Sequence, residues 1–148
     1  MSTLKWKRMR ASELCEIERA QPDKVYREGS YIIPLSGVNR AVCAVLMKPS
    51  TVESRFAVLE PREDVPPYYF ATICDEEIDR FLATYATGIN LQLDTLKKHF
   101  KFNWHTDRKT REALNIVFRD LEHKIWKTQL KIEIKKEQKA YMLEKMFV

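Results

Sequence analysis

The chain has 148 residues, a formal net charge of +5, three cysteines and a hydrophobic fraction of 45%. This length fits one domain with an additional arm, and the apolar fraction is sufficient for a hydrophobic core. The three cysteines are odd in number, widely spaced and without a CxxC pair, which argues against a disulfide framework and a zinc knuckle. The longest apolar run, at residues 41–47, is too short to cross a bilayer, and no apolar segment follows the charged N-terminus as in a signal peptide. We therefore expect a protein of the reducing cytoplasm that has no membrane contact.

The first forty residues predict short elements joined by turns. Residues 3–10 alternate apolar and basic side chains, which is typical of an edge strand. Residues 11–20 place apolar side chains on one helical face behind Ser12, an N-cap candidate, and so predict a short helix. A turn at residues 28–30 then leads into a strand at residues 31–35, which has a proline near its end.

The middle of the chain predicts two further strands and then a change to helix. The continuous apolar run at residues 41–47 predicts a buried strand, and residues 54–60 predict the next one. From Pro67 to Thr84 the apolar residues recur at helical spacing, so we expect a helix there. A brief helix at residues 95–99 and an extended segment at residues 100–104 complete this part.

The stretch from residue 108 to residue 148 contains no proline or glycine and is rich in good helix formers. It predicts one long helix, capped by Thr106 or Asp107 and about 60 Å long at about 1.5 Å per residue. Apolar residues first recur at alternating steps of four and three, as in a heptad seam, and then drift by about one position. The seam residues are Leu114, Phe118, Leu121, Ile125, Ile132 and Leu143.

A small domain cannot cover a helix of that length, so we expect the seam to pair with a helix from a second copy or another protein. The alternative is a surface helix packed on its own domain. The whole pattern predicts an α+β fold: a small mixed α/β head at residues 1–105, followed by a long coiled-coil helix at residues 106–148.

The charge of the chain is distributed unevenly. Residues 97–148 hold 14 Lys and Arg against 7 Asp and Glu, whereas residues 1–96 hold 12 against 14. A basic helix is typical of contact with a polyanion or an acidic protein, although a solvated helix face has the same composition.

No catalytic motif is complete in this sequence. Val65 precedes Pro66-Pro67-Tyr68 where an amino-methyltransferase needs a hydrogen-bond acceptor, and three glycines are too few for a methyl-donor loop. The histidines are far apart and no side chain has a nucleophile signature. We expect the carboxylates near residue 75 to form a solvated acidic face and not a metal site; they are Asp75, Glu76, Glu77 and Asp79. The prediction is a non-catalytic protein without cofactor or metal.

Three segments, in this order and spacing, carry a resemblance to a known family. They are PPYYF at residues 66–70, TGINLQLDTL at residues 87–96 and LEKMF at residues 143–147, and the strand SRFAVL at residues 54–59 fits the same pattern. The chain resembles the DNA specificity (S) subunit of type I restriction–modification systems. In that family a target-recognition domain ends with a Pro-x-Tyr helix, then a Ser/Thr-Gly-x-Asn-x-Gln stretch, then a long helix. A full S subunit has two such domains and two long helices, so the resemblance is to a half-size S subunit.

The resemblance implies a non-catalytic DNA-specificity protein. Two copies paired through their helices would restore the family arrangement, and the symmetry of this homodimer would predict a palindromic split target in double-stranded DNA. A methyltransferase (M) subunit would supply catalysis, and a restriction or motor (R) subunit is a further candidate partner.

Contacts to phosphates and base edges need basic, hydroxyl or amide side chains on exposed loops. The candidates in this sequence are Lys24, Arg27, Asn39, Arg40, Lys48, Ser50, Thr51 and Arg55. Two other functions stay open. One is an assembly or decoy module that binds the methyltransferase without reading DNA. The other is a free-standing DNA-binding regulator, against which the near-neutral head speaks.

Overall fold

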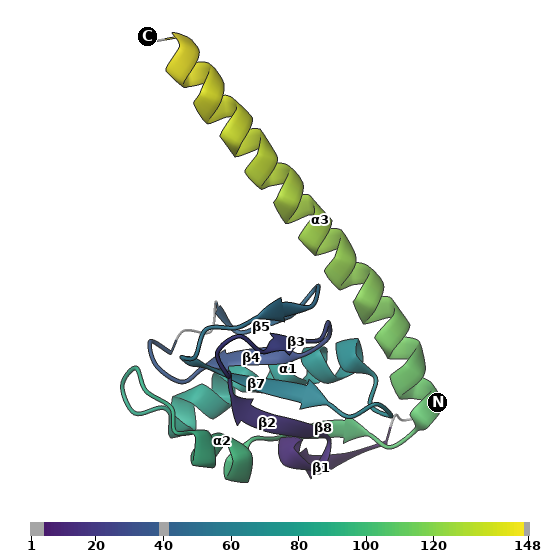
Figure 1. Ribbon diagram of the computed structural model, residues 1–148. Coiled ribbons are helices and arrows are strands. Elements are labelled where there is room, and N and C mark those ends of the chain that lie inside the picture. Colours follow the sequence, from purple (N-terminus) through teal and green to yellow (C-terminus); the bar gives the residue numbers. More distant parts are fainter. Residues whose placement is uncertain (1–4, 39–41, 147–148) are drawn as a thin grey trace.

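A mixed α+β head carries one long helix that leaves it at a corner (Figure 1). The computed structural model describes residues 5–38 and 42–146. The helical elements are the 3-10 turn η1 (Ala11–Glu13), α1 (Pro67–Tyr85), α2 (Leu93–His99) and α3 (Arg108–Met146). The strands are β1 (Trp6–Arg10), β2 (Cys15–Arg19), β3 (Val25–Tyr26), β4 (Tyr31–Pro34), β5 (Ala44–Val45), β6 (Ser50–Thr51), β7 (Phe56–Pro61) and β8 (Lys101–His105). The predicted fold class, an α+β head with a long C-terminal helix, is confirmed.

The main sheet is antiparallel and has the strand order β2-β7-β4-β5. Its central strand β7 is apolar and buried from Phe56 to Leu59, as expected for a strand covered on both faces. Two short ribbons flank this sheet: β3 pairs with β6, and β1 pairs with β8. The second ribbon closes the head, because it joins the first described strand of the chain to the last one before α3.

Aromatic side chains from α1 and β8 fill the core beside the sheet. Phe70 and Phe102 are edge-to-face with ring centroids 5.9 Å apart, and Phe102 is 5.8 Å from Phe100. Tyr69 is edge-to-face with Trp104 at 4.7 Å. Such geometry adds to the burial of large apolar surfaces, so aromatic packing helps to fix α1 and β8 to each other.

Two sequence predictions are wrong in this region. Residues 11–20 form the turn η1 and then strand β2, not a helix, because Cys15 and Ile17 are buried with exposed Glu16 between them. That period of two suits a strand, and pairing with β7 decides the outcome. The apolar run at residues 41–47 gives only the two-residue edge strand β5, in which Ala44 is exposed. Ala41 lies outside the described residues.

The start of α3 follows the capping rule. The Asp107 carboxylate accepts hydrogen bonds from the N–H groups of Lys109 and Thr110, both at 3.3 Å, and from the Thr110 hydroxyl at 2.7 Å. These bonds, chiefly that of the hydroxyl, lower the pKa of Asp107. Asp107 is therefore the N-cap residue, one of the two that the sequence offered.

The three cysteines, Cys15, Cys43 and Cys74, are buried and free of disulfides, as their spacing predicts. Burial raises the pKa of the Cys15 and Cys74 thiols, so both behave as small core residues. Within the described residues, no helix is long and apolar enough to span a membrane.

Candidate nucleic-acid interface and helix seam

The long helix α3 is fixed to the head by a side chain that caps another helix. Helix α1 begins at Pro66-Pro67 and has no side-chain cap of its own. Asn115 on α3 supplies one: its Oδ1 atom accepts hydrogen bonds from the N–H groups of Tyr68 and Tyr69, at 2.9 and 3.0 Å. Because the first N–H groups of a helix have no partner within the helix, this contact ties the position of α3 to the direction of α1.

A second polar contact lies about two helical turns further along α3. The Tyr68 hydroxyl donates a hydrogen bond to Glu28 Oε1 at 2.5 Å, and His123 Nε2 lies 3.6 Å from the same oxygen. Burial, with Glu28 as a second cause, raises the pKa of Tyr68, so the phenol remains a donor. Gly29 has φ of +91°, and a Cβ there would be 2.7 Å from the Pro67 Cβ atom. The turn that holds Glu28 thus requires glycine.

The first part of α3 also packs on the core. Leu114 and Phe118 are partly buried against it, and Arg111 donates a hydrogen bond to the His105 carbonyl at 2.8 Å. The Arg111 guanidinium lies 5.7 Å from the Trp104 ring centroid, within cation–π range. The first two predicted seam residues are therefore used within the chain, as the alternative of packing on its own domain requires.

The second part of α3 has no such cover. All residues from 127 to 146 are exposed, and Figure 1 shows the helix extending past the head. The remaining seam residues stay open: Leu121 is 50% exposed, Ile125 52%, Ile132 47% and Leu143 44%. Apolar side chains are also exposed on the opposite side of the helix, at Ile116, Leu130, Ile134 and Tyr141. An apolar stripe left open over this length is typical of a surface that a partner helix covers.

A groove of 470 Å³ lies between the head and α3. Its walls are residues 43–48 and Ser50 from the head, with Asp75, and Glu122, Ile125, Trp126 and Gln129 from α3. Burial, and secondarily Asp75, raises the pKa of Glu122. The Tyr31 hydroxyl donates a 2.5 Å hydrogen bond to Asp75, so Asp75 belongs to the packing under α3.

The acidic cluster on α1 differs from its sequence prediction. Glu77 is buried, not solvated, and pairs with Arg8 at 2.7 Å and with Arg80 at 3.6 Å. Together with Asp75, this means that two of the four carboxylates are structural. Among the residues that the structure describes, no three His, Cys, Asp or Glu side chains are grouped as metal ligands.

The pairing of β3 with β6 brings together four of the eight predicted DNA-contact residues. Val25 stands opposite Thr51 and Tyr26 opposite Ser50, so Lys24 and Arg27 flank the two hydroxyl residues. Lys48 lines the groove beside α3, whereas Arg55 lies beside Ser36 and donates to its carbonyl at 3.3 Å. Asn39 and Arg40 lie outside the described residues.

Three of these basic residues already have carboxylate partners. Lys24 pairs with Glu18 at 2.6 Å, Arg27 with Glu60 at 3.2 Å and Arg55 with Glu53 at 3.1 Å. The hydrogen bond between Lys24 and Glu18 raises the pKa of Lys24 and lowers the pKa of Glu18. The positive charge of this surface is therefore partly compensated.

Sequence reasoning missed two sets of residues. Asn115 gave no signal, because its role depends on the end of a distant helix. The second set is a group of basic side chains on β1, α2 and β8, at Arg10, Lys97, Lys98 and Lys101. Their signal was present in the run of basic residues before Ala11 and in the excess of Lys and Arg after residue 96.

Comparison with solved structures gives the fold a context. The crystal structure of the type I restriction–modification S subunit from M. genitalium matches 93% of this chain with a TM-score of 0.72 and 9% sequence identity. A structure of a type I R-M system, described for its complex assembly and conformational transition, matches 91% with a TM-score of 0.56 and 14% identity. The HsdS subunit from Thermoanaerobacter tengcongensis matches 85% with a TM-score of 0.50 and 11% identity.

This chain spans less than half of each matched chain, at 44%, 43% and 39% of their lengths. No protein-family model and no curated protein matches the sequence. The likeness at these identities is one of fold: the chain has the architecture of one half of an S subunit, with one α+β domain and one long helix. The predicted resemblance is confirmed at that level.

Proposed function

We propose that this chain, which has the fold of half an S subunit, is a non-catalytic DNA-specificity subunit of a type I restriction–modification system. It acts in the cytoplasm as a homodimer, which directs a methyltransferase subunit to double-stranded DNA. The observation that carries this proposal is the combination of that fold with the uncovered apolar stripe of α3. One copy has one recognition domain and one open helix. Two copies related by a two-fold axis therefore supply two recognition domains and two long helices.

The spacing of the open seam residues fits antiparallel pairing of two α3 helices. In such a pair, residues equidistant from the two-fold axis face each other, and Ile132 lies midway in the chain between Leu121 and Leu143. An axis at Ile132 therefore places Leu121 of one copy against Leu143 of the other. Both are about half exposed in the single chain, so burying the rest contributes about half of the 1.5 to 3 kcal/mol expected for full burial of such a side chain.

Cysteine cross-linking tests this arrangement. The native cysteines are buried, so an introduced thiol on α3 is the accessible one. Ile132→Cys is expected to form a disulfide between copies, and Leu121→Cys combined with Leu143→Cys is expected to form two. Leu121→Cys alone should give none in an antiparallel pair, whereas a parallel pair would cross-link it readily. A monomer by light scattering would contradict the dimer itself.

Co-expression with a type I methyltransferase subunit tests the function. We expect a stable complex in which methylation is confined to a split, palindromic DNA sequence. The control is the methyltransferase alone. Equal activity and equal selectivity with and without this chain would contradict the proposal.

An assembly or decoy module, which binds the methyltransferase without reading DNA, is the second candidate function. The observation that favours it is the ion pairing of Lys24, Arg27 and Arg55, which reduces the free positive charge of the predicted DNA-contact loops. The two functions differ in one measurement. A specificity subunit changes which sites are methylated, whereas a decoy binds the methyltransferase and lowers methylation at every site.

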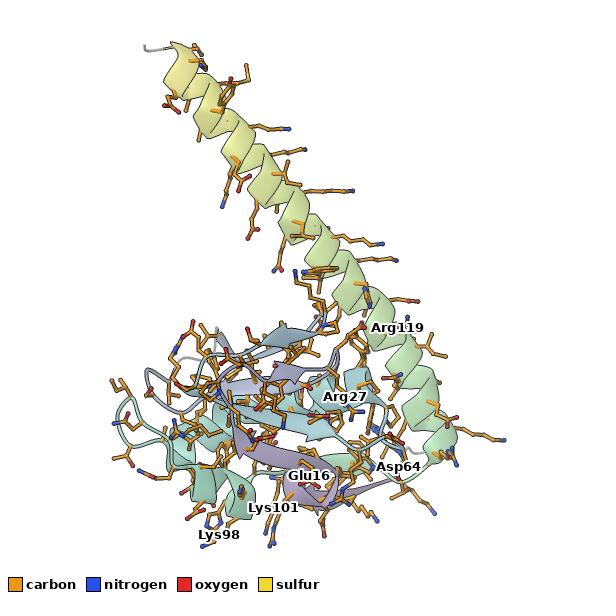
Figure 2. All side chains as sticks on the ribbon, in the orientation of Figure 1. Glu16, Arg27, Asp64, Lys98, Lys101 and Arg119 are labelled. Atoms are coloured by element: carbon orange, nitrogen blue, oxygen red, sulfur yellow. The ribbon has the colours of Figure 1, made fainter. Side chains whose placement is uncertain are left out.

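The proposal leaves two surfaces of the head as candidates for DNA contact. One is the β3–β6 side predicted from the sequence, which holds Lys24, Arg27, Lys48, Ser50 and Thr51, with Arg55 further along. The other is the basic side formed by β1, α2 and β8. They lie in different parts of the head: in Figure 2 Arg27 lies on the side of the head nearer to α3, whereas Lys98 and Lys101 lie at the far edge.

A further inference from the structure

We propose that the surface formed by β1, α2 and β8 grips the phosphate backbone of duplex DNA, with Arg10, Lys98 and Lys101 as its central contacts. We call this surface the basic face. This inference rests on the proposed function, because it assigns the DNA-contact surface of the same protein. The basic face is not the surface that the sequence predicted for DNA contact.

The basic face has a high density of positive charge. Residues 5–10 and 93–105 contain seven Lys and Arg against one carboxylate, Asp94. The pairing of β1 with β8 gathers these two distant segments on one side of the head, with α2 directly before β8. The basic side chains are all exposed or nearly so; they are Lys5, Lys7, Arg8, Arg10, Lys97, Lys98 and Lys101.

The second observation is an unfavourable pairing inside the ribbon. Arg10 stands directly opposite Lys101 in the β1–β8 register. Two like charges in this position destabilise a strand pair. Among the described residues, neither side chain has a carboxylate oxygen within 4.0 Å. A bound anion would relieve this repulsion, so the ribbon is better suited to the bound state than to the free state.

The third observation is a prearranged cationic cavity beside the same ribbon. Arg8 donates hydrogen bonds to Asn103 Oδ1 at 3.1 Å and to the buried Glu77 at 2.7 Å, which fixes its guanidinium. Arg8 and Arg80 share this single carboxylate and therefore leave a net positive charge. The cavity has a volume of 230 Å³ and is also lined by His99 and Lys101. Guanidinium groups held in this way suit the fork geometry of phosphate binding.

The rival surface on the head has less free charge among its described residues, where Lys48 is the one predicted contact cation outside the ion pairs. Its cations Lys24, Arg27 and Arg55 each hold a carboxylate within 3.2 Å, and phosphate binding would have to replace those partners. On the basic face, Arg8 is paired with Glu77, and the carboxylates close in sequence are Glu13, Glu16 and Asp94. They are fewer than the seven cations, so the face remains positive.

The position of the basic face suits a complex of several proteins. Figure 1 shows β1 and α2 along the edge of the head opposite to the free end of α3. A partner helix on the open part of α3 therefore leaves the basic face uncovered. DNA and protein partners would occupy separate sides of the molecule.

Matched charge removal tests the inference. The full chain, in complex with the methyltransferase subunit, carries Arg10→Gln, Lys98→Gln and Lys101→Gln together. The control complex carries Lys24→Gln, Arg27→Gln and Arg55→Gln, which removes the same charge from the other side of the head. Affinity for a mixed-sequence DNA duplex is measured by fluorescence anisotropy over a range of salt concentrations. Circular dichroism melting confirms that each variant is folded.

The basic-face variant should lose affinity on the order of tenfold, and its salt dependence should flatten by about 0.9 per lost phosphate contact, or about 2.7 for three. Lys98→Arg with Lys101→Arg should retain the wild-type slope, because the charge is kept. The control variant should bind as the wild type does. A wild-type complex that binds no duplex overturns this inference and the proposed function together. Wild-type binding with an unchanged basic-face variant, or with loss confined to the control, overturns this inference alone.

Discussion

Asn115 shows how one polar side chain can set the direction of a whole helix. Asn115→Ala leaves the N–H groups of Tyr68 and Tyr69 without an acceptor. We expect a loss of about 1 kcal/mol in the free energy of unfolding, measured by urea denaturation, as for other lost helix caps. Asn115→Asp keeps an acceptor oxygen at the positive end of α1 and should be close to wild type. Equal stability of the alanine variant would show that the cap does not form in solution.

Glu122 makes stability depend on pH in a direction opposite to that of most carboxylates. Burial and Asp75 raise its pKa above the ordinary value of 4.5 in the folded chain. The folded state therefore favours the protonated form; this contribution is fully present below pH 4.5 and is lost as pH rises through the folded-state pKa. Glu122→Gln should be more stable than wild type at pH 7, and the difference should vanish in denaturation experiments below pH 4.5. A difference that is constant with pH would contradict this account.

At the scale of the element, α3 offers a matched pair of substitutions. Ile132 lies on the predicted seam and is 47% exposed, whereas Ile134 lies on the opposite side of the helix and is 54% exposed. Ile132→Asp should abolish the dimer in light scattering, because two buried carboxylates would meet at the two-fold axis. Ile134→Asp carries the same chemical change and should leave the dimer intact. If Ile134→Asp abolished the dimer and Ile132→Asp did not, the dimer contact would lie on the side of α3 that carries Ile134.

The elements differ in how well the sequence predicts them. Helices α1 and α3 were predictable, because a periodic apolar pattern over many residues specifies a helix strongly. Strand β2 was not, since five residues satisfy a helical and an alternating pattern equally and only its pairing with β7 decides between them. The seam was predicted, but the use of Leu114 and Phe118 within the chain depends on the docking angle that Asn115 fixes.

The candidate site was less predictable than the fold. Loop position indicated Lys24, Arg27 and Arg55, yet the carboxylates that partner them come from separate strands or loops that only the folded chain brings close. The basic face joins residues 5–10 to residues 93–105, and no local pattern reports a pairing over that distance. Individual charges can be read from a sequence, whereas their compensation is a property of the tertiary structure.

At the scale of the whole molecule, α3 would set the distance between the two heads of the proposed homodimer. Duplicating residues 120–126 after Trp126 adds seven residues, about 10.5 Å, and keeps the seam on the same side. Both arms of the dimer lengthen, so the heads should separate by about 21 Å, or about six base pairs at 3.4 Å per step. Sequencing of methylated DNA should show half-sites moved apart by that number.

An insertion of a different length provides the control for this spacing. Five added residues at the same position rotate the seam by about 140° relative to the head, since each residue turns an α-helix by about 100°. The two heads would then no longer face the same side of the DNA, and we expect selective methylation to be lost. Unchanged spacing in the seven-residue variant would show that α3 does not set the distance between half-sites.

The pairing of β1 with β8 also has a consequence for the order in which the chain folds. On the ribosome, residues 6–10 emerge first but find their partner strand only after residues 101–105 have been made. The amino end of α1 is capped still later, because its cap, Asn115, belongs to α3. Pairings between such distant segments form slowly and leave core surfaces exposed in the meantime. A nascent chain that stalls before Trp104 would expose an incompletely folded head to chaperones and proteases. The head can therefore finish folding only after the first part of α3 has been synthesised.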